Sequence, residues 1–182
     1  EVELAYRHDN GTVIGITGTN GKTTTTSLTY DIMKRHAKKA LLVGNIEIPY
    51  TGYALESDKD SVTVAEISSF QLETMVTFKP HVTAILNITP DHLDRHKTLE
   101  NYIAIKESIT KNQDENDFCV LNYNDPVLRE FGKTPRCKVI FFSSSEELES
   151  GVFLRGDTMI IKENGVETPV CTTKDTSLVG MH

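Results

Sequence analysis

The 182 residues are enough for one domain with a substantial buried core. The net charge is −7 without a compensating basic stripe, which argues against general binding to nucleic acids or membrane surfaces. The three cysteines are widely spaced and form no Cys-x-x-Cys pair, which excludes a disulfide framework and fits a reducing cytoplasm. No apolar run approaches the roughly 20 residues of a membrane span.

The chain divides into a leading segment, a core and a smaller C-terminal unit. Residues 1–11 end in a polar stretch and indicate a linker. Residues 12–182 form one domain in this interpretation, with a core over 12–145 and a smaller unit over 146–175. The sequence does not begin with methionine and stops directly after Gly180-Met181, so we expect a piece of a longer protein.

Strands and helices alternate through the core. Strands are expected over 13–17, 40–43, 62–67, 82–88, 118–121 and 138–142. This alternation predicts an α/β fold, with a mostly parallel sheet and helices on both faces. Ligands of such sheets collect outside the carboxyl ends of the strands.

Local signals place three helices in the core. The recurrence of Leu28, Ile32 and Met33 predicts a helix over 22–36. Thr98 is a candidate N-cap for a helix running to about Lys111. A shorter helix should begin at Asp125-Pro126.

The pattern changes after the serines at 143–145. Short β-rich runs over 152–155, 159–162 and 166–170 are separated by Gly156-Asp157 and Asn164-Gly165. Asn-Gly is a strong signal for a two-residue hairpin turn. This unit is expected to be a small antiparallel meander packed beside the main sheet.

The turn between the first strand and the first helix reads Gly18-Thr19-Asn20-Gly21-Lys22-Thr23. Backbone N–H groups freed by glycines at a helix N-terminus make a concave anion site, and Lys22 adds a positive charge. Thr23 offers a hydroxyl to a magnesium ion on the phosphates. The turn therefore predicts a triphosphate site, although only two residues separate Gly18 from Gly21, fewer than in the usual phosphate loop.

Polar residues follow the next strands as well, and each has an ordinary structural explanation. Asn45 suits a turn, Glu66 suits a surface, and Ser68 and Ser69 suit helix caps. His92 and His96 lie four apart, but no third ligand for zinc is evident. Considered together with Lys22, they favour a site where Thr23 and Glu66 hold one magnesium ion and a second metal lies near His92.

Three stretches in this order resemble the Mur ligase family, which adds amino acids to the peptidoglycan precursor. The loop at 18–23 matches that family's shortened phosphate motif, and Asp91-His92-Leu93-Asp94 matches its Asp-His-hydrophobic-Asp motif. The stretch 68–73, Ser-Ser-Phe-Gln-Leu-Glu, is most similar to the branch that adds D-glutamate. The resemblance covers essentially the whole chain.

The resemblance implies a role for individual residues. ATP would be bound by Gly18, Thr19, Asn20, Gly21, Lys22, Thr23 and Thr24, and two Mg²⁺ ions by Thr23, Glu66, His92 and Lys106. Lys22, His92 and Lys106 would be catalytic, and Asn45, Ser68, Gln71 and His92 would contact the acceptor. Lys106 matches the family lysine that reacts with carbon dioxide to form a carbamate, which requires a neutral amine.

The implied activity is an ATP-dependent, ADP-forming ligation of D-glutamate to UDP-N-acetylmuramoyl-L-alanine through an acyl phosphate. The implied partners are ATP, this acceptor and D-glutamate, without nucleic acid, in a monomer of the bacterial cytoplasm. The family's N-terminal UDP-binding domain and C-terminal domain are not within this chain, so we expect that it does not ligate alone.

Two departures and two alternatives remain. Glu47 stands where the family usually has glycine, and the chain stops at His182 before the asparagines that face adenine. The alternatives are another Mur ligase or a folylpolyglutamate synthase, and a regulatory nucleotide-binding module without catalysis. The joint presence of Glu66, His92 and Lys106 argues against the regulatory module.

Overall fold

A computed structural model describes residues 1–46 and 48–175, so the expectations for Glu47 and for Gly180-Met181-His182 fall outside the described residues. The helices are α1 (Val2–Tyr6), α2 (Lys22–His36), α3 (Ser69–Leu72), α4 (Leu93–His96), α5 (Leu99–Glu107) and α6 (Pro126–Phe131). The strands are β1 (Thr12–Thr17), β2 (Lys39–Gly44), β3 (Ser61–Glu66), β4 (Val82–Ile85), β5 (Phe118–Asn122), β6 (Lys138–Ser143), β7 (Gly151–Arg155), β8 (Thr158–Glu163) and β9 (Val166–Thr172). Single 3₁₀ turns lie at η1 (Tyr50–Gly52), η2 (Ala54–Glu56), η3 (Ser108–Thr110) and η4 (Thr173–Asp175).

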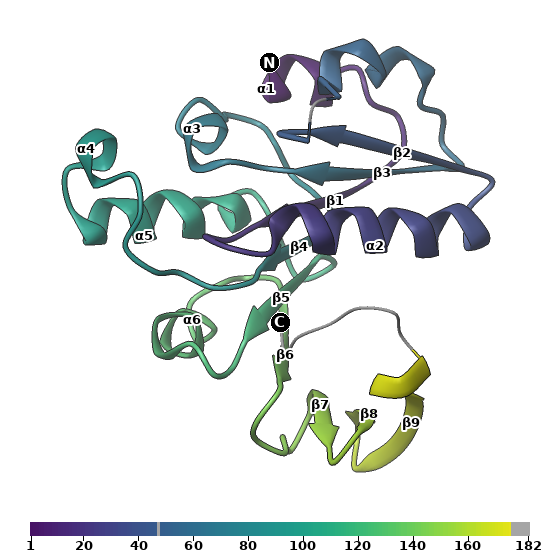
Figure 1. The fold of residues 1–182 in the computed structure, drawn as a ribbon. Helices are drawn as coiled ribbons and strands as arrows, with labels where there is room; N and C mark the ends of the chain where they lie inside the picture. Colours follow the sequence, from purple (N-terminus) through teal and green to yellow (C-terminus); the bar gives the residue numbers. More distant parts are fainter. Residues whose placement is uncertain (47, 176–182) are drawn as a thin grey trace.

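These strands form one sheet in the order β2-β3-β1-β4-β5-β6-β7-β8-β9 (Figure 1). Neighbouring strands from β2 to β7 are parallel, whereas β8 and β9 pair antiparallel. The predicted mostly parallel α/β sheet is therefore confirmed. The antiparallel unit does not pack beside the sheet, however, because β7 pairs with β6 and the unit continues the sheet itself.

Side chains of β1 alternate between two buried clusters, one on each face of the sheet. Ile14 and Ile16 meet the inner side of α2, where Tyr30 and Met33 pack. On the opposite face, Val13 belongs to the main core, which α1, α3, α5, η3 and α6 share. Helices thus cover both faces, as the alternating pattern predicts.

Helix α2 buries a different stripe from the one expected. Leu28 and Ile32 are 44% and 47% exposed, and only Met33 of the predicted set packs on the sheet. Thr26 is the fully buried residue of the helix, with its hydroxyl donating to the carbonyl oxygen of Lys22. The inner face of α2 is therefore partly polar, and hydrophobic spacing alone did not identify it.

The leading segment is ordered and packs on the core. Residues 2–6 form α1, and Val2 and Ala5 are buried against η1 and the main core. Glu3 accepts hydrogen bonds from the backbone N–H groups of 76–78. That residues 1–11 are a linker to another domain stays a prediction.

Several local predictions are confirmed. The Thr98 hydroxyl accepts from the Asn101 N–H and caps α5, and the Asp125 carboxylate caps α6 with Pro126 in its first turn. Asn164 and Gly165 both have positive φ, 52° and 79°, and turn β8 into β9. None of the helices in the described residues is long and apolar enough to cross a membrane.

Candidate functional site

The strand register gathers the predicted polar residues at one edge of the sheet. Gly44 of β2 and Ile16 of β1 both lie opposite Glu66 of β3, and Thr17 lies opposite Ile85 of β4. The chain leaves β1 between β3 and β4, where the strand order reverses direction. Such a switch point leaves a crevice beyond the strand ends, and this is where α/β sheets bind ligands.

The phosphate loop, residues 18–23, is a tight turn that hydrogen bonds to Asn87 hold in place. Gly21 has φ 82° at the N-cap of α2, a left-handed conformation that glycine adopts without strain. The Thr19 N–H donates to the Asn87 carbonyl oxygen (2.9 Å), and the Asn20 N–H donates to Asn87 Oδ1 (2.9 Å). Asn87 Nδ2 returns a hydrogen bond to the Asn20 carbonyl oxygen at 3.0 Å. The loop is thus held in shape by the protein itself.

Lys22 lies folded over this loop. Its ammonium group donates to the carbonyl oxygens of Gly18 (3.1 Å) and Thr19 (2.8 Å). Thr23 and Thr24 follow in the first turn of α2, and both are exposed. The helix N-terminus, the lysine and the hydroxyls therefore face one open surface, which is the arrangement of an anion site.

Glu66 is a buried carboxylate with a partner on each oxygen. Thr23 Oγ1 donates to Oε2 at 2.7 Å, and Asn45 Nδ2 donates to Oε1 at 2.9 Å, while the residue is 1% exposed. Gly44 allows β2 to lie close to the backbone of Glu66, because a Cβ at residue 44 would lie 2.2 Å from the Glu66 carbonyl oxygen. Its φ of 101° also favours glycine. The structure therefore joins three of the predicted site residues, Thr23, Glu66 and Asn45.

Lys106 is buried directly beneath the phosphate loop. Its Nζ donates to the Gly18 carbonyl oxygen at 2.8 Å and lies 3.4 Å from Thr17 Oγ1, with 1% of the residue exposed. Burial and the nearby Lys22 together lower the pKa of Lys106 to about 7, against an opposing effect of Asp91. The neutral amine, which is the form that acts as a nucleophile, is therefore far more accessible near pH 7 than for an ordinary lysine.

Tyr102 connects α5 to the phosphate loop, a role that we did not predict from the sequence. It is 1% exposed, with its hydroxyl 3.1 Å from Thr19 Oγ1 and its ring 4.8 Å from Lys106 Nζ. Tyr102 and Lys106 are four apart on one face of the predicted helix, so helical spacing from Lys106 could have identified it. Asn87 was also missed as a loop support, although it follows β4 at the same sheet edge.

Ser68 and Gln71 form a capping box at the start of α3. The Ser68 hydroxyl accepts from the Gln71 N–H (3.2 Å), and Gln71 Oε1 accepts from the Ser68 N–H (2.9 Å). This is the structural role that the sequence offered as the alternative for Ser68. Their contact with an acceptor substrate stays a prediction.

His92 lies in the turn before α4, apart from the phosphate loop contacts. It has a left-handed backbone at φ 50°, a side chain 49% exposed, and a ring 5.0 Å from that of Phe70. Asp91 Oδ2 is 3.5 Å from His92 Nε2. The structure brings Lys22, Thr23, Asn45, Glu66 and Lys106 together, whereas His92 meets none of these side chains among the described contacts.

The disfavoured zinc site at His92 and His96 finds no support. His96 is 3% exposed, and its nitrogens face Ser69 and Glu73 rather than His92. Across residues 1–46 and 48–175, no group of three or more His, Cys, Asp or Glu side chains is arranged to hold a metal ion.

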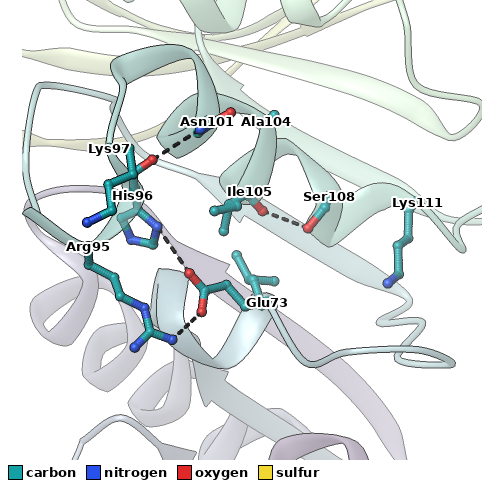
Figure 2. Close-up of a pocket in the computed structure, with 10 residues that line it drawn as sticks. Glu73, Arg95, His96, Lys97, Asn101, Ala104, Ile105, Ser108 and Lys111 are labelled. Carbon is teal, nitrogen blue, oxygen red and sulfur yellow. Dashed lines mark hydrogen bonds and ion pairs between the residues drawn. The ribbon is translucent and has the colours of Figure 1, made fainter. Parts of the chain in front are cut away.

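A pocket of about 560 Å³ lies between α5 and the segments that carry Glu73 and His96 (Figure 2). It is lined by Glu73, Arg95, His96 and Lys97 and by Asn101, Ala104, Ile105 and Ser108 of the α5 side. Lys106 and Tyr102 point from a different face of α5, so this hollow is separate from the candidate nucleotide site. It contains the contacts that join α3 to α4.

Sequence comparison identifies known proteins that are similar to this chain. The family model for the Mur ligase middle domain matches residues 16–181. The UDP-N-acetylmuramoylalanine–D-glutamate ligase of Lachnoclostridium phytofermentans is 51% identical over all 182 residues, and that of Lachnospira eligens is 47% identical. In both cases the chain spans 40% of the length of the relative.

Solved structures of related proteins share the fold. The MurF ligase of Thermotoga maritima in complex with ADP superposes with a TM-score of 0.65 at 23% identity, covering 92% of this chain and 42% of that one. FolC of E. coli in complex with DHPP and ADP gives 0.58 at 13% identity, covering 93% and 52%. At these identities the likeness concerns the fold alone.

Proposed function

The chain belongs to the Mur ligase family, whose middle domain it matches, and from this we propose that it is the ATP-binding domain of a D-glutamate-adding ligase. The observation that carries the proposal is the cluster of Lys22, Thr23, Glu66 and Lys106 around one phosphate loop. Relatives 47% to 51% identical carry the name of that ligase. The whole reaction belongs to a longer protein, since the chain spans 40% of these relatives.

We propose that the loop at 18–24 binds the phosphates of ATP. The N–H groups at the start of α2 and the Lys22 ammonium would face the phosphate oxygens, and Lys22 would exchange its two carbonyl contacts for them. The loop needs little reorganisation, because Asn87 and Tyr102 already hold Thr19 and Asn20. Preorganised charge at a phosphoryl group is the main source of catalysis in such transfers.

The donor set at Glu66 fits magnesium. Oxygen ligands suit Mg²⁺, and the Glu66 carboxylate and the Thr23 hydroxyl are 2.7 Å apart at the loop. When bound, the ion would neutralise charge on the phosphates. His92 and Lys106 are proposed to serve the second ion.

Lys106 is proposed to become a carbamate. Its neutral Nζ would attack the carbon of CO₂, so that a C–N bond forms, one C–O π bond of CO₂ opens, and the proton lost from nitrogen passes to water. The amine would thereby become an anionic oxygen ligand. The low pKa of Lys106, about 7, supplies the neutral amine this step requires. Burial protects the group from competing reactions in water.

The acceptor is proposed to lie along Asn45, Ser68, Gln71 and His92. Its terminal carboxylate would attack the γ-phosphate, giving an acyl phosphate and ADP, and the amine of D-glutamate would then displace phosphate. The rest of the proposal is a UDP-binding domain before this chain, a further domain after it, a monomeric state, and a place in the bacterial cytoplasm.

The test is amino-acid preference in the full-length protein. ADP release with UDP-N-acetylmuramoyl-L-alanine and ATP should require D-glutamate, while L-lysine, diaminopimelate and glutamate of the L form should not replace it. Preference for another amino acid, or for a folate acceptor, would overturn the assignment. The 182-residue chain alone should bind ATP without ligating.

A further inference from the structure

His96 joins two short elements that carry predicted acceptor contacts. It ends α4, the helix that begins after His92, and its side chain enters the space beside α3, which begins after Ser68 (Figure 2). Both helices have only four residues. Helices this short do not hold their shape without tertiary contacts.

Both ring nitrogens of His96 face α3. Nε2 lies 3.0 Å from the Ser69 hydroxyl, and Nδ1 lies 3.2 Å from Glu73 Oε1. Nδ1 makes no hydrogen bond among the described residues, so the Glu73 carboxylate lies beside it without one. The side chain is fully buried, so water does not compete for either nitrogen.

Aromatic contacts extend this connection to the active-site side. Phe70 stacks on His96 at 5.4 Å and also touches the His92 ring at 5.0 Å. On its other side, His96 lies 5.3 Å from Tyr102, the residue that reaches Thr19 of the phosphate loop. The His96 imidazole thus contacts Phe70 beside His92, Ser69 beside Ser68, and Tyr102 beside the phosphate loop.

The backbone on both sides of α4 indicates that contacts with other elements hold the His92 turn in place. His92 and Lys97, the residues on either side of the helix, have φ values of 50° and 71°, and neither is glycine. Left-handed backbone at such residues persists where surrounding contacts fix it. His96 is the buried residue of α4, and the exposed Arg95 adds an ion pair to Glu73 at 2.7 Å.

We propose that His96 is a positioning residue for the acceptor side of the site. It sets the distance and orientation between the His92 turn and the Ser68–Gln71 cap, and so places the groups that would contact the acceptor. This inference rests on the proposed function, and it assigns His96 no contact with ATP or acceptor. The effect should therefore fall mainly on acceptor binding and turnover, because His96 reaches the nucleotide loop only indirectly, through Tyr102.

The test compares two variants with a matched control in the full-length protein. His96→Phe keeps the ring but loses both nitrogens, whereas His96→Gln keeps an amide near Ser69. The control His81→Phe removes another histidine that faces a carboxylate (Asp117, 3.1 Å) and an aromatic ring, far from the site. Misplacement of catalytic groups by about 1 Å costs up to roughly a hundredfold in rate.

His96→Phe should lower kcat by about tenfold or more and raise the acceptor KM severalfold, with the ATP KM changed less than about twofold. His96→Gln should recover part of the loss, and His81→Phe should match the unchanged protein. A loss of kcat that equals the fraction of unfolded protein, with both KM values unchanged, would overturn the proposal. If His96→Phe does not fold, Ser69→Ala should give the same KM pattern more weakly, and wild-type constants there would equally overturn it.

A second readout separates this proposal from the proposed function. If the unmodified full-length protein shows no D-glutamate-dependent ADP release, the proposed function fails by itself. The ring NMR signals of His92 in the 182-residue chain still report the geometry. They should shift in His96→Phe and stay in place in His81→Phe, and unshifted signals in His96→Phe would refute positioning by His96.

Discussion

Replacing Gly44 by alanine should disrupt the edge of the sheet where Glu66 lies. The added Cβ would stand 2.2 Å from the Glu66 carbonyl oxygen, and 3.1 Å from both its carbonyl carbon and its N atom. These are backbone atoms, so a side-chain rotation cannot relieve the contact. Residue 44 also has φ 101°, where alanine is strained even in open space.

The expected destabilisation has two parts. Strained backbone at a non-glycine residue costs about 1–3 kcal/mol, and forcing atoms into a packed site costs about another 1–3 kcal/mol. The sum is about 2–6 kcal/mol. In a domain of 150–250 residues, 1 kcal/mol lowers Tm by about 2–4 °C, so Gly44→Ala should lose at least about 4 °C.

The matched control is Gly156→Ala, between β7 and β8. Gly156 has φ 61° and no atom within 4 Å of an added Cβ, so this variant has a milder left-handed strain and no collision. Urea unfolding of both variants, followed by circular dichroism, separates the two parts through the midpoint at constant m-value. Equal free energies of unfolding for Gly44→Ala and Gly156→Ala would refute the collision at Glu66.

Further predictions concern three side chains. Because the folded pKa of Lys106 is about 7, below its usual 10.5, the unfolded chain binds more protons between these values. The free energy of unfolding should therefore rise with pH above 7, by at most about 1.4 kcal/mol per pH unit, and Lys106→Met should remove this slope in pH-dependent urea unfolding. Thr98→Ala removes the cap of α5 and should cost about 1 kcal/mol in the same assay, and an unchanged midpoint would contradict the capping role. Lys22→Met should weaken ADP binding by about tenfold or more in calorimetry, since contacts to charged groups contribute about 1.5–3 kcal/mol, while Lys38→Met in the exposed turn after α2 should not.

The sheet and the phosphate loop were predictable because their signals are local. Apolar runs followed by polar residues gave the strands of the core, and glycine spacing gave the loop at 18–23. The prediction of β4 over 82–88 ran too long, since the strand ends at Ile85 and the chain turns there to support the phosphate loop. The strand order β2-β3-β1-β4 could not be predicted from the sequence, because it depends on which strands pair across the fold.

The features that could not be predicted depend on contacts between residues far apart in the sequence. α1 escaped prediction because five residues carry too little periodicity, and its stability comes from Val2 and Ala5 packing on the core. His96 was considered as a zinc ligand with His92 and disfavoured, but its partners Ser69 and Glu73 lie 27 and 23 positions away in the chain. Burial lowers the pKa of Lys106, and the sequence of a helix does not show which of its lysines is buried.

The central claim is that this domain serves ligation through an acyl phosphate formed at the loop of Lys22. Its most direct test is oxygen transfer in the full-length protein, with the terminal carboxylate of the acceptor labelled by ¹⁸O. With ATP and D-glutamate present, the account predicts one ¹⁸O atom from the acceptor in each inorganic phosphate released. Phosphate without label, released at the rate of product formation, would contradict it.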